Sequence, residues 1–576
     1  MRVSDYVIQF LRDSYNIDTI FTVSGGGCIF LIDSLGHTEG VKYMATHHEQ
    51  AAAIAAEGYA RINNKLGACV VTSGPGGTNA ITGTLCSWLD SIPVIVISGQ
   101  VNKEMTTNYT ELPLRQLGDQ EFNIVESVKN MTKYVIQVND PTEIRYHLEK
   151  ACKLATSGRP GPVWVDIPLN IQSADINPNE LNGYSESQVL YEPTSVDIDT
   201  LLVKWKEAKK PLMIIGNGIR LSNGIDSLYN ILNKTNIPVI TAVNGNDIVN
   251  SDYKHYCGRF GTHAQIGANN LLSECDFLLT VGSRLYVRQT GYNFEGFAKQ
   301  AYKIHVDIDL AELNKPTLYT DLKIHSDAKI FLDNINNFEL PKTDNTWLNR
   351  CFDWSCEPTV LPKHRNKTKI TSHYAFIEQL SEAMPSDHHI ITSDGSANVV
   401  TMQVMNLTGN QRLITNTGCA PMGYGLPAAL GAATHHKVVC IEGDGSLHLN
   451  IHELQTMKHY NLPIKLILLN NDGYTSIKIS QKAFFNGQFT ASEKNSGVSF
   501  PNFEKVIKAY DLPYYSIKDN NNIHPTLTEF LLQDGPCVLE VFTDPDEYHE
   551  PKVVAKLDAN GKFIPGELKN IQWIES

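Results

Sequence analysis

The chain has 576 residues, of which 42% are apolar and 19% are charged, and its net charge is −14. These values are typical of a globular protein, and the length predicts several domains rather than one core. The acidic balance argues against nucleic acid or an anionic membrane as a partner, and no apolar run reaches the ~18 residues of a membrane span. Eleven scattered cysteines without zinc-type spacing predict reduced thiols in a cytoplasmic protein.

Helix and strand patterns alternate along the chain. In the N-terminal part, residues 1–14, 49–61 and 79–90 read as helices and residues 19–23, 68–72 and 94–98 as strands. Further strands are expected at 211–215, 277–281, 305–308, 390–393, 438–441, 464–469 and 537–541. Alternation of this kind predicts an α/β protein built from doubly wound parallel sheets covered by helices.

Two polar stretches divide the chain. Residues 170–195 and 340–368 carry little periodicity and are predicted to be linkers. We therefore expect three α/β domains, at residues 1–180, 190–345 and 360–576.

One pair of motifs indicates a metal-bound diphosphate. Gly443-Asp444-Gly445-Ser446 follows the strand at 438–441, and Asn471-Asp472-Gly473 follows the strand at 464–469. Between them, a helix start is expected just beyond Ser446 and a helix at 450–459. Neighbouring parallel strands would bring both motifs to one sheet edge, where oxygen ligands and glycines suit Mg²⁺ and a phosphate group. The alternative is two unrelated turns at strand ends.

A second feature is Glu49, which follows His48 at the start of an alanine-rich helix. Tight packing of that helix would surround the carboxyl group with apolar atoms, which favours a group that shares a proton. The alternative is an ordinary first-turn glutamate stabilised by the helix dipole.

Two glycine-rich turns also follow strands. Residues 72–79 could cradle a phosphate but lack the Gly-Lys-Ser/Thr ending of a P-loop. Gly216-Asn217-Gly218 does not complete the dinucleotide pattern, because Leu221 stands at the last glycine position. Alone, neither turn identifies a ligand.

Together and in this order, the motifs resemble thiamine-diphosphate-dependent decarboxylases and carboligases, and most closely the acetolactate synthase large subunit. The resemblance covers essentially the whole chain, with anchors at residues 48–61, 72–79, 90–93, 99–101, 120–121, 422–427, 443–446 and 471–473. It implies a pyrimidine-binding N-terminal domain, a central domain and a diphosphate-binding C-terminal domain. The cofactor would lie between two subunits, so the resemblance implies a homodimer at least, with a tetramer plausible by the family pattern.

The resemblance also implies site residues. Asp444, Asn471 and the Gly473 carbonyl would hold Mg²⁺. Contacts to thiamine diphosphate are expected from Thr72, Asn79, Ser396, Asn398, Gly443, Gly445, Ser446, Tyr474 and Ile477. Met422 would prop the cofactor into its bent shape, Glu49 would hydrogen-bond the pyrimidine ring nitrogen, and Gln120 would face the substrate.

Finer differences bear on the reaction. Simple decarboxylases of this family carry an acidic residue where Ile477 stands and a His-His pair in the N-terminal domain, whereas residues 100–120 contain no histidine. Without these proton donors we expect a 2-keto acid, by default pyruvate, to yield a two-carbon unit that joins a carbonyl acceptor. A plain 2-keto acid decarboxylase stays the alternative, and an inactive paralogue is disfavoured because Glu49 and the magnesium ligands are present.

The acceptor stays open between two classes. Ser480 stands near the position where biosynthetic acetolactate synthases have a tryptophan, which predicts a wider and more polar pocket. Residues 115–118 and 476–485 resemble acetolactate-synthase-like proteins of surface-sugar pathways, one class of which transfers the unit to a nucleotide-linked keto-sugar. Plain acetolactate formation is the family default.

The central domain is expected to bind FAD without a net redox role. Gly216, Gly218, Arg284 and Asp307, with residues 261–262 and 309, match flavin contacts in acetolactate synthases, although Arg259-Phe260 replaces the usual Met-His. Arg284 also aligns with an arginine that meets the acceptor carboxylate. The alternative is a purely structural domain.

Overall fold

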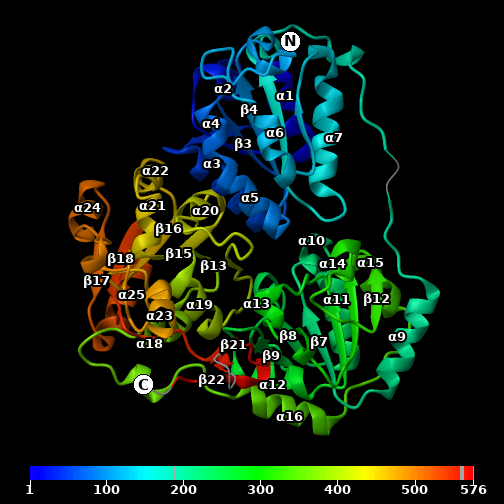
Figure 1. Ribbon diagram of the computed structural model, residues 1–576, viewed down its shortest axis with the longest axis vertical. Coiled ribbons are helices and arrows are strands. Elements are labelled where there is room, and N and C mark those ends of the chain that lie inside the picture. The colour runs from blue at the N-terminus through cyan, green and yellow to red at the C-terminus, as the bar shows by residue number, and fades with distance from the viewer. Residues whose placement is uncertain (187–188, 558–562, 575–576) are drawn as a thin grey trace.

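A computed structural model of the protein describes residues 1–186, 189–557 and 563–574. Figure 1 shows three α/β domains, each built on a six-stranded sheet. Every pairing within these three sheets is parallel. The predicted fold class is therefore confirmed.

The N-terminal sheet has the order β2-β1-β3-β4-β6-β5. Its strands are β1 (Thr19–Thr22), β2 (Lys42–Ala45), β3 (Gly67–Val71), β4 (Val94–Gln100), β5 (Val135–Gln137) and β6 (Val163–Pro168). Its helices are α1 (Val3–Tyr15), α2 (Ile29–His37), α3 (Glu49–Asn63), α4 (Pro75–Asn79), α5 (Ile81–Asp90), α6 (Ile124–Val128), α7 (Ile144–Thr156) and α8 (Leu169–Gln172). Alternate residues of β3 pack into two different apolar clusters, which shows that both faces of this sheet are covered.

The middle sheet has the order β12-β11-β10-β7-β8-β9. Its strands are β7 (Pro211–Ile215), β8 (Val239–Thr241), β9 (Tyr256–Arg259), β10 (Phe277–Val281), β11 (Tyr302–Asp307) and β12 (Leu322–His325). The helices are α9 (Ser195–Glu207), α10 (Gly218–Leu221), α11 (Ile225–Thr235), α12 (Ile266–Glu274), α13 (Val287–Thr290), α14 (Leu310–Asn314), α15 (Ala328–Asn336) and α16 (Asn345–Ser355). On α16, Trp347 is buried and donates to the carbonyl of Pro211, 2.9 Å away. The domain limits at 180–190 and 345–360 stay predictions.

The C-terminal sheet has the order β14-β13-β15-β16-β18-β17. Its strands are β13 (His388–Thr392), β14 (Leu413–Ile414), β15 (Lys437–Gly443), β16 (Ile464–Asn470), β17 (Tyr514–Ile517) and β18 (Cys537–Phe542). The helices are α17 (Pro362–Arg365), α18 (His373–Ala383), α19 (Gly395–Val404), α20 (Gly425–Ala432), α21 (Asp444–Leu449), α22 (Glu453–His459), α23 (Thr475–Phe484), α24 (Phe503–Ala509) and α25 (Ile523–Leu532).

The last described segment returns to the middle domain. The short strands β19 (Lys552–Val553) and β22 (Ile571–Gln572) pair with each other, as do β20 (Lys556–Leu557) and β21 (Phe563–Ile564). The backbone N–H of Val553 donates to Thr262, and the amide of Asn269 donates to the carbonyl of Leu568. This segment therefore ties the C-terminal domain to the middle one.

Two predicted helices have different boundaries in the structure. The helix expected at 79–90 is α5, which begins at Ile81, and Asn79 instead ends the short helix α4. The helix expected at 450–459 is α22, and it is preceded by α21, which begins at Asp444 itself rather than beyond Ser446. An early start is favourable, because an acidic side chain in a first turn interacts well with the helix dipole.

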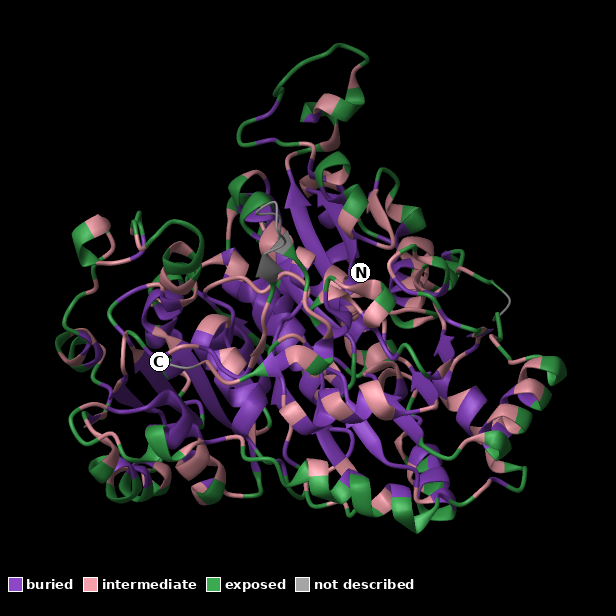
Figure 2. Ribbon diagram, turned by 60° about the horizontal axis from the view of Figure 1, so that its bottom comes forward, coloured by how far each residue is buried: buried purple, intermediate pink, exposed green. Residues whose placement is uncertain are grey.

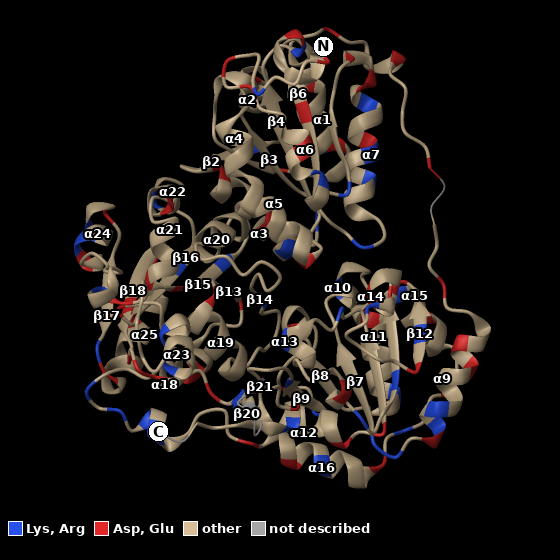
Figure 3. Cartoon of the chain, viewed as in Figure 1, with Lys and Arg blue, Asp and Glu red and all other residues tan. Residues whose placement is uncertain are grey.

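Burial and charge follow the layered architecture. The sheet strands are mostly buried, whereas the helices keep exposed outer surfaces (Figure 2). Positive and negative side chains are both present on all three domains (Figure 3). Among the described residues, no helix is both long and apolar enough to cross a membrane.

Candidate active site

The structure brings the two acidic and amide motifs together at one edge of the C-terminal sheet. Strands β15 and β16 are parallel neighbours, so the turns that follow them lie side by side. Asp444 Oδ1 accepts the N–H of Gly445 at 2.7 Å. Its Oδ2 accepts the N–H of Asn471 at 3.0 Å and that of Gly473 at 3.3 Å. The carboxylate is thus held by the backbone of both turns.

This cluster has unused oxygen ligands. Asp444 is only 2% exposed, and burial raises the pKa of its carboxyl group to about 6, although backbone hydrogen bonds act in the opposite direction. The side-chain oxygen of Asn471 is buried and has no hydrogen-bond partner. A buried amide oxygen without a partner is costly, and a bound cation would remove that cost. The donor set therefore fits Mg²⁺.

A glycine cradle adjoins the cluster. A Cβ at Gly445 would lie 2.3 Å from the Tyr474 ring and 3.2 Å from Cε of Met422, so only glycine fits there. Ser446 Oγ accepts the N–H of Gly423 at 2.8 Å, which holds the loop that carries Met422 against α21. The predicted residues of this region, including Gly443, are therefore contiguous in space.

Ser396 and Asn398 lie in the first turn of α19, after the neighbouring strand β13. Ser396 Oγ is 2.8 Å from Nε2 of His549, and the Asn398 amide donates to Oγ1 of Thr415 at 2.6 Å. No sequence motif singled out His549, because it comes from the distant C-terminal segment. Only the folded chain places it beside α19.

The other half of the site is in the N-terminal domain. Glu49 is 9% exposed at the start of α3, and the amide of Asn79 donates to its Oε2 at 2.9 Å. A Cβ at Gly76 would stand 3.6 Å from Oε1, so the missing side chain leaves room there. Thr72 Oγ1 accepts the N–H of Gly27 at 3.0 Å, which fixes the turn at the end of β3.

Gln120 packs against the same turn through its backbone. It has a positive φ of 57°, and its carbonyl oxygen would be 2.3 Å from a Cβ at Gly74. The Gln120 side chain is exposed in the single chain. On α23, Ile477 is 47% exposed, and Ser480 is also exposed, with its hydroxyl donating to the Ser476 carbonyl.

Helices α3 and α20 fix the two domains against each other. A Cβ at Gly58 would be 2.2 Å from the carbonyl oxygen of Ala428, and one at Gly431 would be 1.9 Å from that of Ala55. Within the described residues, however, no hydrogen bond joins Glu49 or the turn at 72–79 to Asp444, Asn471 or Gly473. The two predicted half-sites are therefore not connected within one chain.

A large cavity of about 930 Å³ lies between the N-terminal and middle domains, away from Asp444. Gly218, Arg284 and Asp307 line it. Gly216 lies just behind this wall, where a Cβ would be 2.1 Å from the carbonyl oxygen of Gly282. Burial raises the pKa of Asp307 to about 6.

Two arginines line this cavity. Arg284 lies 3.6 Å from Asp90 and 4.7 Å above the ring of Tyr286. Arg159, which sequence reasoning missed, pairs with Asp309 at 2.8 Å and Glu312 at 2.9 Å. The Gly-Arg-Pro-Gly sequence around Arg159 is the signal that could have drawn attention to it.

Asp309, also matched to a flavin contact, lines the cavity as well, whereas the segment at 259–262 lies elsewhere. Arg259 donates to the carbonyls of Met402 at 3.1 Å and Met405 at 2.7 Å, so it links β9 to α19. Neither Gly261 nor Thr262 is among the described residues that line the cavity. The backbone of Thr262 bonds instead to Arg288 and Val553.

Comparison with known proteins agrees with this geometry. Three family models match: the thiamine pyrophosphate enzyme N-terminal TPP binding domain over residues 1–126, the central domain over 198–335 and the C-terminal TPP binding domain over 394–541. The chain is 32% identical to acetolactate synthase isozyme 2 large subunit of Escherichia coli K12, over 94% of this chain and 96% of the relative. It is 30% identical to the acetolactate synthase large subunit of Lactococcus lactis, over 97% of this chain and 95% of that one. It is also 30% identical to the chloroplastic acetolactate synthase of Arabidopsis thaliana, over 97% and 83% of the two chains. The chain therefore belongs to the thiamine-diphosphate-dependent enzymes and is a carboligase of the acetolactate synthase type.

Proposed function

We propose that this carboligase decarboxylates pyruvate and joins the resulting two-carbon unit to a carbonyl acceptor, with thiamine diphosphate and Mg²⁺ as cofactors. The observation that carries the proposal is the buried pair of Asp444 and Asn471, in which an amide oxygen without a partner adjoins a backbone-held carboxylate. Such a pair stabilises a hard cation and has no evident structural use without one.

The C-terminal domain would hold the diphosphate end of the cofactor. Asp444, Asn471 and the Gly473 carbonyl would bind Mg²⁺. The predicted diphosphate and ring contacts come from Gly443, Gly445, Ser446, Ser396, Asn398, Met422, Tyr474 and Ile477. Bound thiamine diphosphate supplies a nucleophilic carbon and an electron sink, while the protein supplies position and charge.

Glu49 would hold a proton against the pyrimidine ring nitrogen. The Asn79 amide occupies Oε2, which orients the carboxyl group and leaves Oε1 beside the space opened by Gly76. Packing of α3 against α20 keeps this helix start rigid, as a positioned proton donor requires. Thr72 and Asn79 shape the turn that lines the same space.

In a homodimer, the N-terminal domain of one subunit would complete the site with the C-terminal domain of the other. A tetramer built from two such dimers would keep the same site. In one chain, no hydrogen bond among the described residues joins Glu49 or the turn at 72–79 to Asp444, Asn471 or Gly473. The loop between β4 and α6 exposes large apolar side chains, including Tyr109 at 58% and Leu112 at 63%. An exposed apolar group of this kind is typical of a protein interface.

Carbon–carbon bond formation is supported by what stands near the reacting end. Ile477 cannot donate a proton, so it gives no help to aldehyde release. Gln120 would hydrogen-bond the substrate. The acceptor is a second 2-keto acid or, because Ser480 leaves α23 without a bulky ring at that position, a nucleotide-linked keto-sugar.

FAD is proposed for the large cavity. Its volume of about 930 Å³ is in the range of cofactor sites, and the glycines at 216 and 218 let the backbone approach closely. Nη2 of Arg284 is buried without a hydrogen-bond partner, which suits a diphosphate. Asp307 would accept from a ribose hydroxyl group.

A cytoplasmic location is proposed on the state of the thiols. All eleven cysteines are free thiols outside any disulfide bond, and most of them are buried. Unbonded cysteines are typical of a reducing compartment.

One experiment tests the reaction and its acceptor. Purified enzyme with thiamine diphosphate, Mg²⁺, FAD and pyruvate should form a ligated product, and product analysis with added 2-keto acids or keto-sugar nucleotides should identify the preferred acceptor. Acetaldehyde as the sole product under all conditions would establish a plain decarboxylase. Yellow colour of the purified protein, with FAD released on denaturation, tests the flavin separately.

Glu49→Gln tests the pyrimidine half of the site. Turnover should fall at least about 100-fold, since a proton-transfer group is lost, while binding of Mg²⁺ and diphosphate persists. Glu126→Gln, an exposed residue on α6, is the matched control. Near-normal turnover in Glu49→Gln would contradict the assignment.

A further inference from the structure

A second cavity, of about 220 Å³, lies where all three domains meet. The N-terminal domain contributes Arg61 and Lys65, the middle domain Arg220 and Asn244, and the C-terminal domain Arg412. It shares part of its wall with the large cavity, including Asn244. Of its basic side chains, Arg61 ends the anchor motif at 48–61, whereas Lys65, Arg220 and Arg412 belong to none of the motifs that led to the thiamine and flavin sites.

The pocket is strongly positive. Four of its described lining residues are cationic and none is acidic. Arg220 and Arg412 share one carboxylate, that of Asp247, which is 7% exposed and accepts Arg220 Nη2 at 2.9 Å and Arg412 Nε on its other oxygen. This trio therefore keeps one positive charge that no carboxylate in it balances.

Arg61 does not add to that excess, because two carboxylates surround its single positive charge. Its guanidinium group contacts Glu57 at 2.7 Å and Asp90 at 2.6 Å. Lys65 is exposed at the mouth of the pocket. The uncompensated charge is thus concentrated on Arg220, Arg412 and Lys65.

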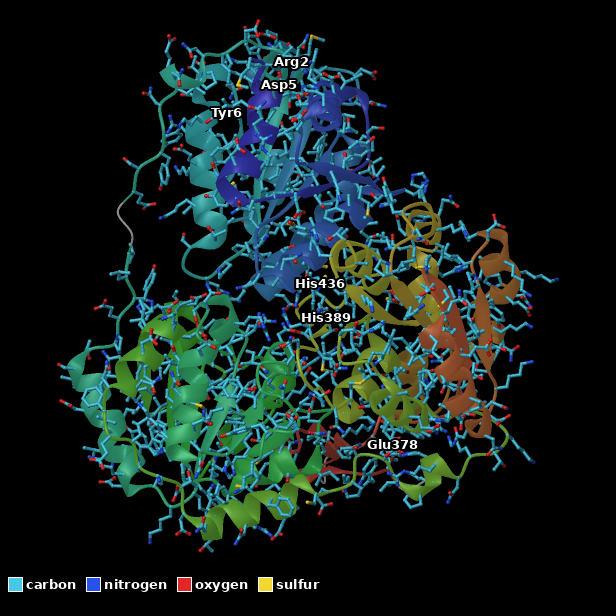
Figure 4. The ribbon with its side chains drawn as sticks, turned by 180° about the vertical axis from the view of Figure 1, so that it is seen from behind. Arg2, Asp5, Tyr6, Glu378, His389 and His436 are labelled. Atoms are coloured by element: carbon cyan, nitrogen blue, oxygen red, sulfur yellow. The ribbon has the colours of Figure 1, made fainter. Side chains whose placement is uncertain are left out.

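A hydrogen-bonding group at the pocket is also unused. Arg220 Nε, a hydrogen-bond donor, is buried and has no partner. The remaining neighbours do not supply a counter-charge. His389 Nδ1 accepts the backbone N–H of Arg412 at 3.1 Å, and the ring of His436 stands 4.8 Å from that of His389 (Figure 4).

The electrostatics agree with this geometry. Burial lowers the pKa of Arg412, and Arg220 lowers it further, although Asp247 acts in the opposite direction. Burial, with His436 and Arg412, lowers the pKa of His389 to about 4. Burial is the larger cause of both shifts, and the further lowering by Arg220 and Arg412 reflects the positive charge gathered at this site.

We propose that this three-domain pocket binds a phosphate group. Guanidinium groups match the oxygen spacing of phosphate, and a dianion would balance the excess charge while filling the free donor of Arg220. The volume suits one phosphate rather than a whole nucleotide. The ligand is either free inorganic phosphate or the phosphate of a nucleotide. Because the large cavity is the one proposed for FAD, a nucleotide that reaches the pocket through the shared wall would have to displace FAD.

Equilibrium dialysis of the holoenzyme against labelled inorganic phosphate, in a chloride buffer, tests this proposal. Saturable binding near one phosphate per chain is expected, with a rise in Tm. Lys65→Ala and Arg220→Gln should each weaken binding at least tenfold. Arg350→Gln, which removes an exposed arginine of α16 outside the pocket, should leave binding unchanged. Lys65 is exposed, so its variant stays informative even if Arg220→Gln does not fold.

Competition with AMP separates the two sources. If AMP displaces phosphate, binds more tightly than phosphate does and loses affinity in Lys65→Ala, the natural ligand is a nucleotide phosphate. Failure of AMP to displace phosphate identifies the free anion. Absence of saturable phosphate binding, or equal binding in wild type and both pocket variants, would overturn the proposal.

Discussion

The backbone N–H of Asn471 donates to Oδ2 of Asp444 over 3.0 Å, although 27 residues separate them in the chain. The bond uses one carboxylate oxygen and leaves the Asn471 side-chain oxygen buried without a partner. The two turns are therefore preorganised for a cation before it binds.

Asn471→Ala should lower the affinity for Mg²⁺ by about tenfold or more, because it removes a ligand and leaves the fold of β16 intact. Calorimetric titration of Mg²⁺ in the presence of thiamine diphosphate measures the effect. Asn270→Ala, on α12 of the middle domain, is the control. Equal Mg²⁺ affinities in both variants would remove Asn471 from the metal site.

Two glycines of one motif should respond differently to the same change. Gly445→Ala would place a Cβ 2.3 Å from the Tyr474 ring, so the ring must move and thiamine diphosphate affinity should fall at least about tenfold. At Gly443 a Cβ would meet nothing within 4 Å and φ is an ordinary −85°. The proposed cofactor contact of Gly443 is made by its backbone, which Gly443→Ala keeps, so the affinity of this variant should be close to that of the wild type. Fluorescence titration with the cofactor measures both, and the reverse order would refute the cradle.

A buried charge network holds the N-terminal domain against the loop before Met422. Arg61 pairs with Glu57 and Asp90 and also donates to the carbonyl of Thr415 at 3.1 Å. Arg61→Met leaves two buried carboxylates without their cation, and we expect a loss of ~3–5 kcal/mol in the free energy of unfolding.

The exposed pair of Arg365 and Glu378 provides the comparison, with Glu378 labelled in Figure 4. Arg365→Met should cost ~0–1 kcal/mol, because exposed ion pairs contribute little. Denaturant unfolding of both variants measures the difference. Comparable losses would mean that the buried network does not hold the domains together.

Asp166 should give stability a pH dependence. Burial raises its pKa from 3.8 to about 7, although hydrogen bonds from Ser98 and Gln100 lower it. Between these two pKa values the folded state keeps a proton that the unfolded state loses. The contribution of Asp166 to the free energy of unfolding is therefore fully present below pH ~4 and declines as the pH rises towards 7.

Asp166→Asn removes that titration. The Tm of this variant minus the Tm of the wild type, measured by calorimetry, should increase from pH 5 to pH 8. Asp353→Asn, an exposed position on α16, should show no such trend. A constant difference for Asp166→Asn across this range would contradict a buried, protonated carboxyl group.

Much of the fold was available from the sequence, because hydrophobic periodicity reports which faces are buried. The strands around Val70, Leu279 and Ile467 were expected close to where β3, β10 and β16 lie. The pairing of Asp444 with Asn471 was also predictable, since residues that end neighbouring parallel strands share one edge. Boundaries such as the early start of α21 were not, because caps depend on contacts with other turns.

The sequence by itself determined the domain pattern, the cofactor motifs and the absence of an acid at Ile477, since these depend on local order along the chain. Only the tertiary structure decided that His549 reaches Ser396, that Arg159 and Arg284 face one cavity, and that Arg220 and Arg412 share Asp247. These contacts include pairs more than a hundred positions apart in the chain, such as Ser396 with His549 and Asp247 with Arg412. They follow from how whole domains pack, and no local pattern encodes that packing.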